Sequence, residues 1–262
     1  MAALTGKNAI ITGSTSGIGE AIARTLATEG CNIMLNGMGD KAVIDGLVSE
    51  FPQKYGVKTV YSAADMSKPA DIKQMVADCK AQLGSVDILV NNAGIQFTAP
   101  VEEFPEEKWD AIIAINLSAS FHSIKAAIPL MRGQNFGRII NIASVHGLVA
   151  STNKSAYVAA KHGIVGLTKV VALETAETNI TVNAICPAWV HTPLVQKQIE
   201  DKAKAQNISI EEATAKLLGE KQPNKRFIKP ENIAAMIVFL CGENGNSMTG
   251  EIITMDGGWL AQ

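Results

Sequence analysis

The feature that decides the fold is a glycine-rich turn at residues 12–20, which reads TGSTSGIGE. The turn has the pattern G-x-x-x-G-x-G and joins a predicted strand at residues 8–12 to a predicted helix at residues 17–29. Glycines let the backbone turn sharply and approach a pyrophosphate, and the helix N-terminus offers free N–H groups. In this strand-turn-helix setting, the pattern predicts dinucleotide binding. The residues expected to contact the dinucleotide are Gly13, Thr15, Ser16, Gly17, Ile18 and Gly19.

Beyond the turn, short apolar runs alternate with longer amphipathic segments. Such an alternation predicts a parallel sheet that is covered by helices on both faces, and right-handed crossovers make it doubly wound. We therefore predict a single Rossmann-type α/β domain over residues 1–262 with a seven-stranded parallel sheet. The strands are expected at residues 8–12, 31–35, 59–62, 87–91, 137–142, 181–185 and 251–255, and the helices at 17–29, 41–55, 70–83, 109–132, 155–178 and 231–241.

One segment interrupts the alternation, between Pro193 and Pro230. It is polar and helix-prone over residues 195–218 and contains no strand pattern. An insertion between a strand and the next helix lies at the carboxyl edge of a parallel sheet, where α/β proteins bind ligands. We therefore predict a helical substrate lid at about residues 193–222. A surface helical hairpin that makes oligomer contacts is the alternative.

Composition and charge exclude several classes of protein. The hydrophobic fraction of 47% and charged fraction of 18% indicate a compact globular domain. The formal net charge is −2 with scattered Lys and Arg, so neither nucleic acid nor a membrane is a predicted partner. No apolar stretch approaches the roughly 20 residues that span a bilayer, and residues 1–7 lack a signal-peptide pattern, so a cytoplasmic location is expected. The spacing of cysteines and histidines predicts no metal site.

Charge around the turn indicates which dinucleotide is bound. A 2′-phosphate requires Arg or Lys at the turn or just past the second strand. Ser16 and the NGMGD stretch at residues 36–40 supply no cation there, so NAD is predicted rather than NADP. The acidic residue that usually binds the ribose is missing as well. Asp65 and Met66 follow the third strand and are expected near the adenine, with a turn or cap aspartate as the alternative for Asp65.

Ser144, Tyr157 and Lys161 indicate the chemistry of alcohol oxidation. Tyr157 and Lys161 are four residues apart, so they share one face of a helix. The ordinary tyrosine pKa of about 10 is too high for a base near neutrality, and a nearby cation favours the phenolate. Ser144 ends a strand, where its hydroxyl can orient an alcohol. The dinucleotide would accept the hydride and the protein the proton. A chance surface pair is the alternative for the tyrosine and the lysine.

Together with NNAG at residues 91–94, these motifs closely resemble the short-chain dehydrogenase/reductase family over essentially the whole chain. The resemblance implies that Ser144 holds the substrate oxygen and that Tyr157 is the catalytic acid/base. It implies that Lys161 binds the nicotinamide ribose and lowers the pKa of the tyrosine. It also implies a supporting role for Asn116, which would hold a proton-relay water.

The same resemblance extends to cofactor contacts and assembly. It implies that Asn92 and Gly94 stabilise the sheet and flank the cofactor. The segment after the sixth strand would meet the nicotinamide through Pro187, Val190 and Thr192, with Ala188 standing where the family often has glycine. The resemblance further implies a homotetramer packed through the helices at residues 109–132 and 155–178.

Three polar residues lie beside the catalytic elements in sequence: Gln96, His146 and Lys154. We expect all three in one pocket, where a cation, a histidine that could be a second cation and an amide donor suit a small carboxylate. Each residue could instead be a surface or structural side chain. The full predicted substrate set also includes the tryptophans, as walls around a short carbon chain, and one lid amide: Gln96, Ser144, His146, Lys154, Tyr157, Trp189, Gln198 and Trp259.

This set, with GMGD at residues 37–40 and GGW at residues 257–259, resembles the family members that oxidise 3-hydroxybutyrate. The resemblance implies the reversible conversion of (R)-3-hydroxybutyrate and NAD⁺ to acetoacetate and NADH. A 3-oxoacyl-carrier-protein reductase is an alternative, favoured by Lys197, Lys202 and Lys204 in the lid. A sugar or polyol dehydrogenase and a non-catalytic NAD-binding protein are the others.

Overall fold

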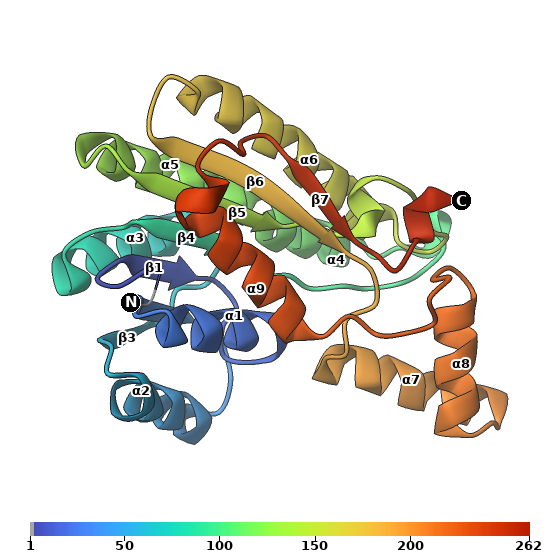
Figure 1. The fold of residues 1–262 in the computed structure, drawn as a ribbon. Coiled ribbons are helices and arrows are strands. Elements are labelled where there is room, and N and C mark those ends of the chain that lie inside the picture. The colour runs from blue at the N-terminus through green and yellow to red at the C-terminus, as the bar shows by residue number, and fades with distance from the viewer. Residues whose placement is uncertain (1–2) are drawn as a thin grey trace.

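The computed structural model describes residues 3–262 and contains one seven-stranded parallel sheet of order β3-β2-β1-β4-β5-β6-β7 (Figure 1). The order reverses between β1 and β4, which is the switch point of a doubly wound sheet. The predicted fold class is thus confirmed, and strand ends differ from the predicted ones by no more than two residues. The strands are β1 Asn8–Ile11, β2 Asn32–Asn36, β3 Thr59–Ser62, β4 Ile88–Asn91, β5 Gly137–Ile142, β6 Ile180–Pro187 and β7 Ile252–Met255.

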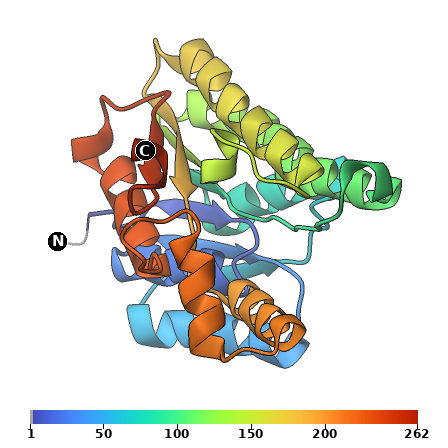
Figure 2. The ribbon, with the colours of Figure 1, turned by 90° about the vertical axis from the view of Figure 1, so that its right-hand side faces the viewer.

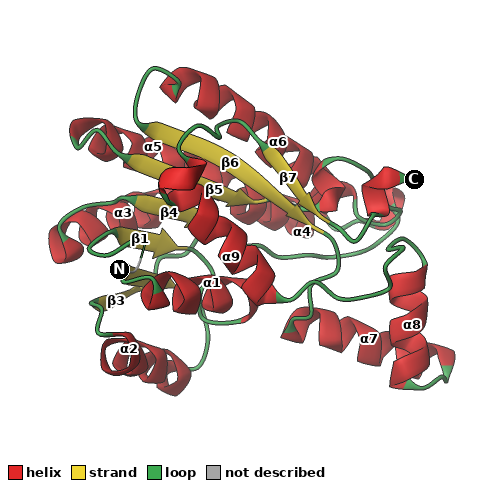
Figure 3. Ribbon diagram, in the orientation of Figure 1, coloured by secondary structure: helices red, strands yellow, loops and turns green. Residues whose placement is uncertain are grey.

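Helices cover both faces of the sheet, as Figures 2 and 3 show. Helices α1, α2 and α9 pack on one face, and α3, α5 and α6 pack on the other. The helix bounds are α1 Gly17–Thr28, α2 Lys41–Tyr55, α3 Pro69–Leu83, α4 Glu106–Ile113, α5 Ala119–Gly133, α6 Ser155–Thr175, α7 Pro193–Gln206, α8 Ile210–Gly219 and α9 Pro230–Cys241.

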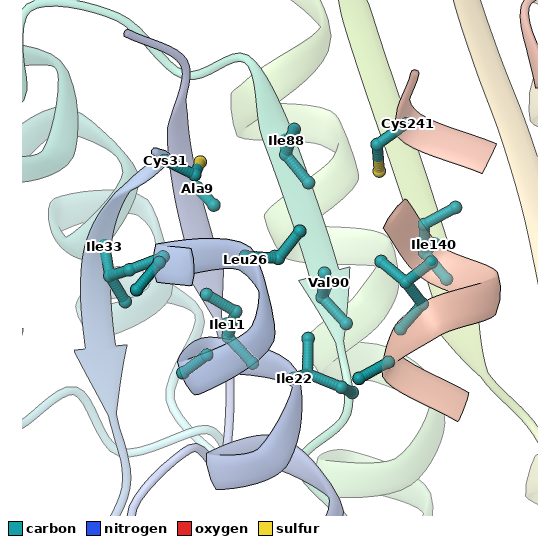
Figure 4. Close-up of a cluster of buried hydrophobic side chains, with 14 of the residues drawn as sticks. Ala9, Ile11, Ile22, Leu26, Cys31, Ile33, Ile88, Val90, Ile140 and Cys241 are labelled. Carbon is teal, nitrogen blue, oxygen red and sulfur yellow. The ribbon is translucent and has the colours of Figure 1, made fainter. Parts of the chain in front are cut away.

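The core follows from the two-residue period of the strands. Ala9 and Ile11 of β1 pack toward α1, where Figure 4 shows them beside Ile22 and Leu26. Ile10, between them, packs on the opposite face with α3 and α5. Because helices cover both faces, the central strands are apolar at nearly every position. The carboxyl ends of these strands are thereby held rigidly at one edge of the sheet.

The prediction of one continuous helix at residues 109–132 is wrong in one respect. The structure divides it into α4 and α5 at a π-helical turn, Ala114–Ser118. Asn116 lies in this turn, where its Oδ1 accepts a hydrogen bond from the Ile95 amide at 2.8 Å and its Nδ2 donates to the Ile95 carbonyl at 2.9 Å. π-helical turns are frequent at functional sites. Here the turn fastens the loop that follows β4.

The segment between β6 and α9 forms two helices, α7 and α8, beside the carboxyl ends of the strands (Figure 1). Asn207 ends α7 in the left-handed conformation, and the Ser209 side chain caps α8 by accepting from the Glu212 amide at 3.1 Å. The pair has its own small apolar cluster, which includes Ile199 and Leu217. The helical character predicted for the segment is correct, whereas its action as a lid stays a prediction.

Two helical stretches are long and apolar enough to cross a membrane, Glu106–Gly133 and Ser155–Thr175. The sequence prediction that no stretch approaches this length is corrected to that extent. Both stretches pack against the sheet and contribute buried side chains to its core, including Ile124 and Val171. Core helices of this kind pass the same length test, so the finding does not indicate a membrane protein.

Candidate active site

The glycine-rich turn is tied to the loop after β4 by a dense set of hydrogen bonds. Asn92 donates its Nδ2 to the carbonyls of Thr12 and Gly13 at 2.9 and 3.0 Å. The Thr12 hydroxyl accepts from the amides of Asn92 and Ala93. The third glycine of the motif, Gly19, packs directly under this contact. The turn therefore has one fixed shape that leaves the N-terminus of α1 open at the sheet edge.

We expect Gly19→Ala to lower the free energy of unfolding by about 1–3 kcal/mol, because overpacking a fixed contact strains the backbone. A Cβ at this position would lie 2.2 Å from the Gly13 carbonyl oxygen and 2.5 Å from the Asn92 Nδ2. Gly46→Ala is the matched control, since a Cβ at this helical position meets nothing within 4 Å. It should stabilise the protein by about 0.5–1 kcal/mol. Urea unfolding measures both, and equal stability of the two variants would contradict the packing argument.

Most of the predicted cofactor residues line one elongated cavity. The cavity runs along the glycine turn and continues into a second cavity, because Ile18, Asn92, Gly94 and Thr192 border both. Gly19 does not line either cavity and acts through packing. The predicted cofactor residues that line one or both are Gly13, Thr15, Ser16, Gly17, Ile18, Met66, Asn92, Gly94, Tyr157, Lys161, Pro187, Val190 and Thr192.

Asp65, like Gly19, is a predicted cofactor residue that does not line either cavity. Its Oδ1 accepts from the Ser67 amide at 2.9 Å and from the Ser67 hydroxyl at 2.7 Å, and its Oδ2 lies 3.4 Å from the Lys68 Nζ. Hydrogen bonds from Ser67 lower the pKa of this carboxyl. The contacts are those of a turn aspartate, in agreement with the alternative interpretation, and a contact of Asp65 with the adenine stays a prediction. Its neighbours Ala64 and Met66 border the cavity in its place.

Asn36, at the end of β2, is a structural residue that the sequence did not reveal. It is fully buried, its Oδ1 accepts from the Gly13 amide at 3.3 Å, and its Nδ2 donates to the carbonyls of Ser62 and Ala64. It therefore joins the glycine turn to the end of β3. The ribose-binding acid expected at a strand end of this kind is replaced by an amide that supports the turn.

Ser144, Tyr157 and Lys161 converge on the second cavity, whose volume is about 180 Å³. Ser144 follows β5, and Tyr157 and Lys161 lie on the first turns of α6. The Lys161 Nζ donates to the Ile142 carbonyl at 2.7 Å and lies 5.6 Å from the centre of the Tyr157 ring. Asn116 stays behind this group, buried in its π-helical turn. The cavity shares Gln96, Lys154 and Trp189 with an outer cavity of about 740 Å³, so the space for a ligand extends beyond the reaction centre.

Burial governs the protonation of the tyrosine and the lysine. Burial raises the pKa of Tyr157 above its ordinary value, and a hydrogen bond with Ser144 acts in the opposite direction. Burial also lowers the pKa of Lys161 to about 8, although the nearby Cys186 raises it. The hydrogen bond with Ser144 is a contact that favours the ionised phenol, and the lowering of the tyrosine pKa by Lys161 that the resemblance implies stays a prediction.

The predicted substrate residues surround the same cavity as Ser144 and Tyr157. Lys154 lies just before α6, with its Nζ 5.2 Å from the centre of the Trp189 ring. Trp189 and Trp259 lie with their ring centres 6.4 Å apart. Gln198 of α7 lines the cavity, whereas its neighbour Gln196 donates a hydrogen bond to Glu200 on the surface. Of the two glutamines, Gln198 is therefore the one that can reach a ligand. The lining includes Gln96, Ser144, His146, Lys154, Tyr157, Trp189, Gln198 and Trp259.

His146 differs from the expectation that it could act as a second cation. It is buried, and burial lowers the pKa of the imidazole to about 4, assisted by the charges of Lys154 and His162. The ring is therefore neutral near pH 7. Burial lowers the pKa of Lys154 as well, while Glu220 opposes the shift. The charge on this side of the cavity comes from Lys154, and His146 contributes hydrogen bonds.

Gln222, which follows α8, forms a hydrogen bond with the backbone of Trp189. It was not identified from the sequence. Only 1% of it is exposed. Its Oε1 accepts from the Trp189 amide at 3.3 Å, and its Nε2 donates to the Arg226 carbonyl and the Asn224 Oδ1. The Asn224 amide in turn donates to the Gly257 carbonyl at 3.1 Å, two residues before Trp259. Hydrogen bonds from the segment that follows α8 thus fix the backbone at or near both tryptophans.

The fold and the site define a class: a doubly wound dinucleotide-binding oxidoreductase with a serine, a tyrosine and a lysine around one cavity. A family model described as "Enoyl-(Acyl carrier protein) reductase" matches residues 13–260. The chain belongs to the short-chain dehydrogenase/reductase family.

Similar proteins cover the chain from end to end. It is 54% identical to a D-beta-hydroxybutyrate dehydrogenase of Cupriavidus necator, over 99% of this chain and 100% of the relative. It is 54% identical to the enzyme of the same name from Rhizobium meliloti, over 98% and 99%. A solved structure of L-sorbose reductase from Gluconobacter frateurii, complexed with NADPH and L-sorbose, has a TM-score of 0.94 at 31% identity and covers 100% of both chains.

Proposed function

We propose that the protein catalyses the reversible oxidation of (R)-3-hydroxybutyrate to acetoacetate with NAD⁺. The observation that carries the proposal is the half-buried cation Lys154, which lines the cavity that also contains Ser144 and Tyr157. The two relatives named D-beta-hydroxybutyrate dehydrogenase, each 54% identical over nearly the full chain, support the same substrate.

The reaction removes a hydride from the carbinol carbon and a proton from its hydroxyl, which leaves a ketone. The bound dinucleotide supplies the hydride acceptor. Ser144 accepts or donates a hydrogen bond at the substrate oxygen and fixes its position. Tyr157 receives the hydroxyl proton in the forward direction and returns it in the reverse direction. Lys161, held by the Ile142 carbonyl, presents its remaining N–H groups to the ribose side of the cavity.

Recognition of the substrate follows from the lining of the cavity. Lys154 pairs with the carboxylate, and Gln96 and Gln198 donate amide hydrogen bonds to it. Trp189 and Trp259 exclude water around the short carbon chain.

NAD is proposed as the member of the nicotinamide class that binds. Within residues 3–262, the lining of the dinucleotide cavity includes no arginine or lysine that could pair with a 2′-phosphate. Lys41, the nearest cation in sequence to β2, lies 2.5 Å from Asp45. The carboxylate of Asp40 caps α2 by accepting from the Ala42 amide, so it places negative charge beside the loop that follows β2. A 2′-phosphate would be repelled there.

The decisive experiment follows NADH absorbance with purified protein and each enantiomer of 3-hydroxybutyrate, with NAD⁺ and then with NADP⁺. We expect turnover of the (R) enantiomer with NAD⁺ and at least tenfold lower activity with NADP⁺. Turnover of a 3-oxoacyl thioester with NADPH, and none of hydroxybutyrate, would instead favour a 3-oxoacyl-carrier-protein reductase. A relative named 3-oxoacyl-[acyl-carrier-protein] reductase, from Staphylococcus epidermidis, is 36% identical to the chain, so this second activity should be assayed as well.

Three further features complete the proposal. Residues 1–262 form one catalytic domain in which α7 and α8 act as a lid, which is supported by Val195 and Gln198 in the lining of the cavity. The protein assembles as a homotetramer, which is supported by exposed apolar side chains on α5 and α6 such as Phe121, Val170 and Leu173. It is cytoplasmic, consistent with a diffusible substrate and cofactor.

A further inference from the structure

A line of polar groups leads away from the Tyr157 phenol and is not used by the reaction described above. Ser144 forms a hydrogen bond with Tyr157. The Ser144 Oγ lies 3.5 Å from His146 Nδ1, and His146 Nε2 lies 2.9 Å from the Ser151 Oγ. Ser151 borders an outer cavity that also touches Lys154, Gln198 and Glu220. The line therefore joins the reaction centre to a second opening of the site.

The direction of the hydrogen bonds follows from what each group can donate. The Ser144 hydroxyl also lies 3.5 Å from the Pro187 carbonyl oxygen, to which it can donate, but a charged phenolate oxygen is the stronger acceptor. When Ser144 donates its only proton to the phenolate, its Oγ is left as an acceptor. The backbone amide of His146 already donates to this Oγ at 3.2 Å, and Nδ1–H of the ring can donate beside it. A neutral imidazole that carries its proton on Nδ1 has an acceptor at Nε2. The Ser151 hydroxyl, at 2.9 Å, then donates to that acceptor.

We propose that His146 and Ser151 are positioning residues for Tyr157, acting through a hydrogen-bond chain from Ser151 to His146 to Ser144 to the phenolate. Each donation polarises the next one, so the chain stabilises the negative charge on the tyrosine oxygen. The proposal rests on the proposed role of Tyr157 as the base. His146 then has two roles, because it lines the substrate cavity and also belongs to the hydrogen-bond chain.

The surrounding groups allow the chain to work near neutral pH. His146 stays neutral, because burial and the charges of Lys154 and His162 disfavour the imidazolium. An imidazolium would donate from both nitrogens and would break the link from Ser151. The other titratable groups near the chain are Lys161 on α6 and Cys186 on β6, together with Lys202, Glu220 and Lys221, which border the outer cavity. Lys202 pairs with Glu220 at 2.7 Å. Cys186 is a thiol whose pKa is raised to about 11 by burial, so it adds no charge.

The test measures the ionisation of Tyr157 directly, by ultraviolet difference titration of the phenolate without substrate. Subtracting the titration of Tyr157→Phe removes the contributions of Tyr55 and Tyr61. We expect Ser151→Ala to raise the pKa of Tyr157 by about 0.3–1 unit, the range of one net hydrogen bond. Ser151→Thr should restore the original value, because it keeps the hydroxyl. Thr152→Ala, which removes an adjacent hydroxyl from the same outer cavity, should leave the titration unchanged.

The pH dependence of kcat/KM provides the second readout. A base with a raised pKa becomes active only at higher pH, so the acidic limb should move upward in Ser151→Ala by the same amount. The shift should also occur with a neutral secondary alcohol, which has no carboxylate for His146 to bind. An unchanged phenol titration, with a raised KM for hydroxybutyrate alone, would overturn the chain and leave a carboxylate contact. Since the titration needs no substrate, a failure of the proposed activity would not be mistaken for a failure of the chain.

Discussion

Replacing Tyr157 with phenylalanine should reduce kcat by about 10²–10⁴-fold, the contribution of a positioned general acid or base. The exchange removes one hydroxyl and keeps the ring, which lies edge-on to His146 with centres 6.0 Å apart. The shape of the cavity should therefore survive. Steady-state turnover with (R)-3-hydroxybutyrate and NAD⁺ measures the loss, and fluorescence titration with NADH should give an affinity close to that of the unmodified protein.

Tyr55→Phe is the matched control for this exchange. Tyr55 lies at the end of α2, against Phe51 with ring centres 5.3 Å apart, and touches neither cavity of the site. Its loss should leave kcat within twofold of the original value. If Tyr157→Phe kept more than a tenth of the activity, the assignment of Tyr157 as the base would fail, whatever the substrate.

The fold could be predicted because its determinants are local in the sequence. Alternating apolar runs and amphipathic segments set the order of strands and helices, and the glycine turn fixed which crossover binds the dinucleotide. The π-helical turn at Ala114–Ser118 could not be predicted in this way. One residue added to a helical turn barely changes an apolar period. The π-helical turn instead accompanies the hydrogen bonds between Asn116 and Ile95, two residues that are 21 positions apart in the sequence.

The candidate site was predictable to the extent that its residues follow catalytic elements closely in sequence. Gln96, His146 and Lys154 were placed by their closeness in sequence to the β4 loop, Ser144 and Tyr157, and the structure brings them to one cavity. Asn36 and Gln222 were missed, because a buried amide looks like a surface amide until its partners are known. The charge of His146 was misjudged for a related reason: its pKa depends on burial, which no local pattern reports.

Lys154→Met should lower kcat/KM for (R)-3-hydroxybutyrate by about 10- to 100-fold, because a hydrogen bond to a charged group contributes roughly 1.5–3 kcal/mol. Methionine keeps an unbranched apolar stem that can lie against the Trp189 ring, as the lysine does. The loss should therefore report the charge and not the packing. Activity on a neutral secondary alcohol should change by less than threefold. Equal losses on both substrates would show that Lys154 supports the reaction centre instead of the carboxylate.

The pH dependence of KM gives a sharper version of the same test. Burial lowers the pKa of Lys154, so its ammonium deprotonates at a lower pH than an exposed lysine does. Only the ammonium pairs with a carboxylate, so KM for the hydroxy acid should rise on the alkaline side in the unmodified enzyme. That rise should be missing in Lys154→Met, where KM is already high. Lys197→Met, which removes an exposed lysine from α7, should preserve both the low KM and its alkaline rise. If Lys197→Met raised KM as strongly as Lys154→Met, the carboxylate would be attracted by the surface charge of α7 and not bound by Lys154 in the cavity.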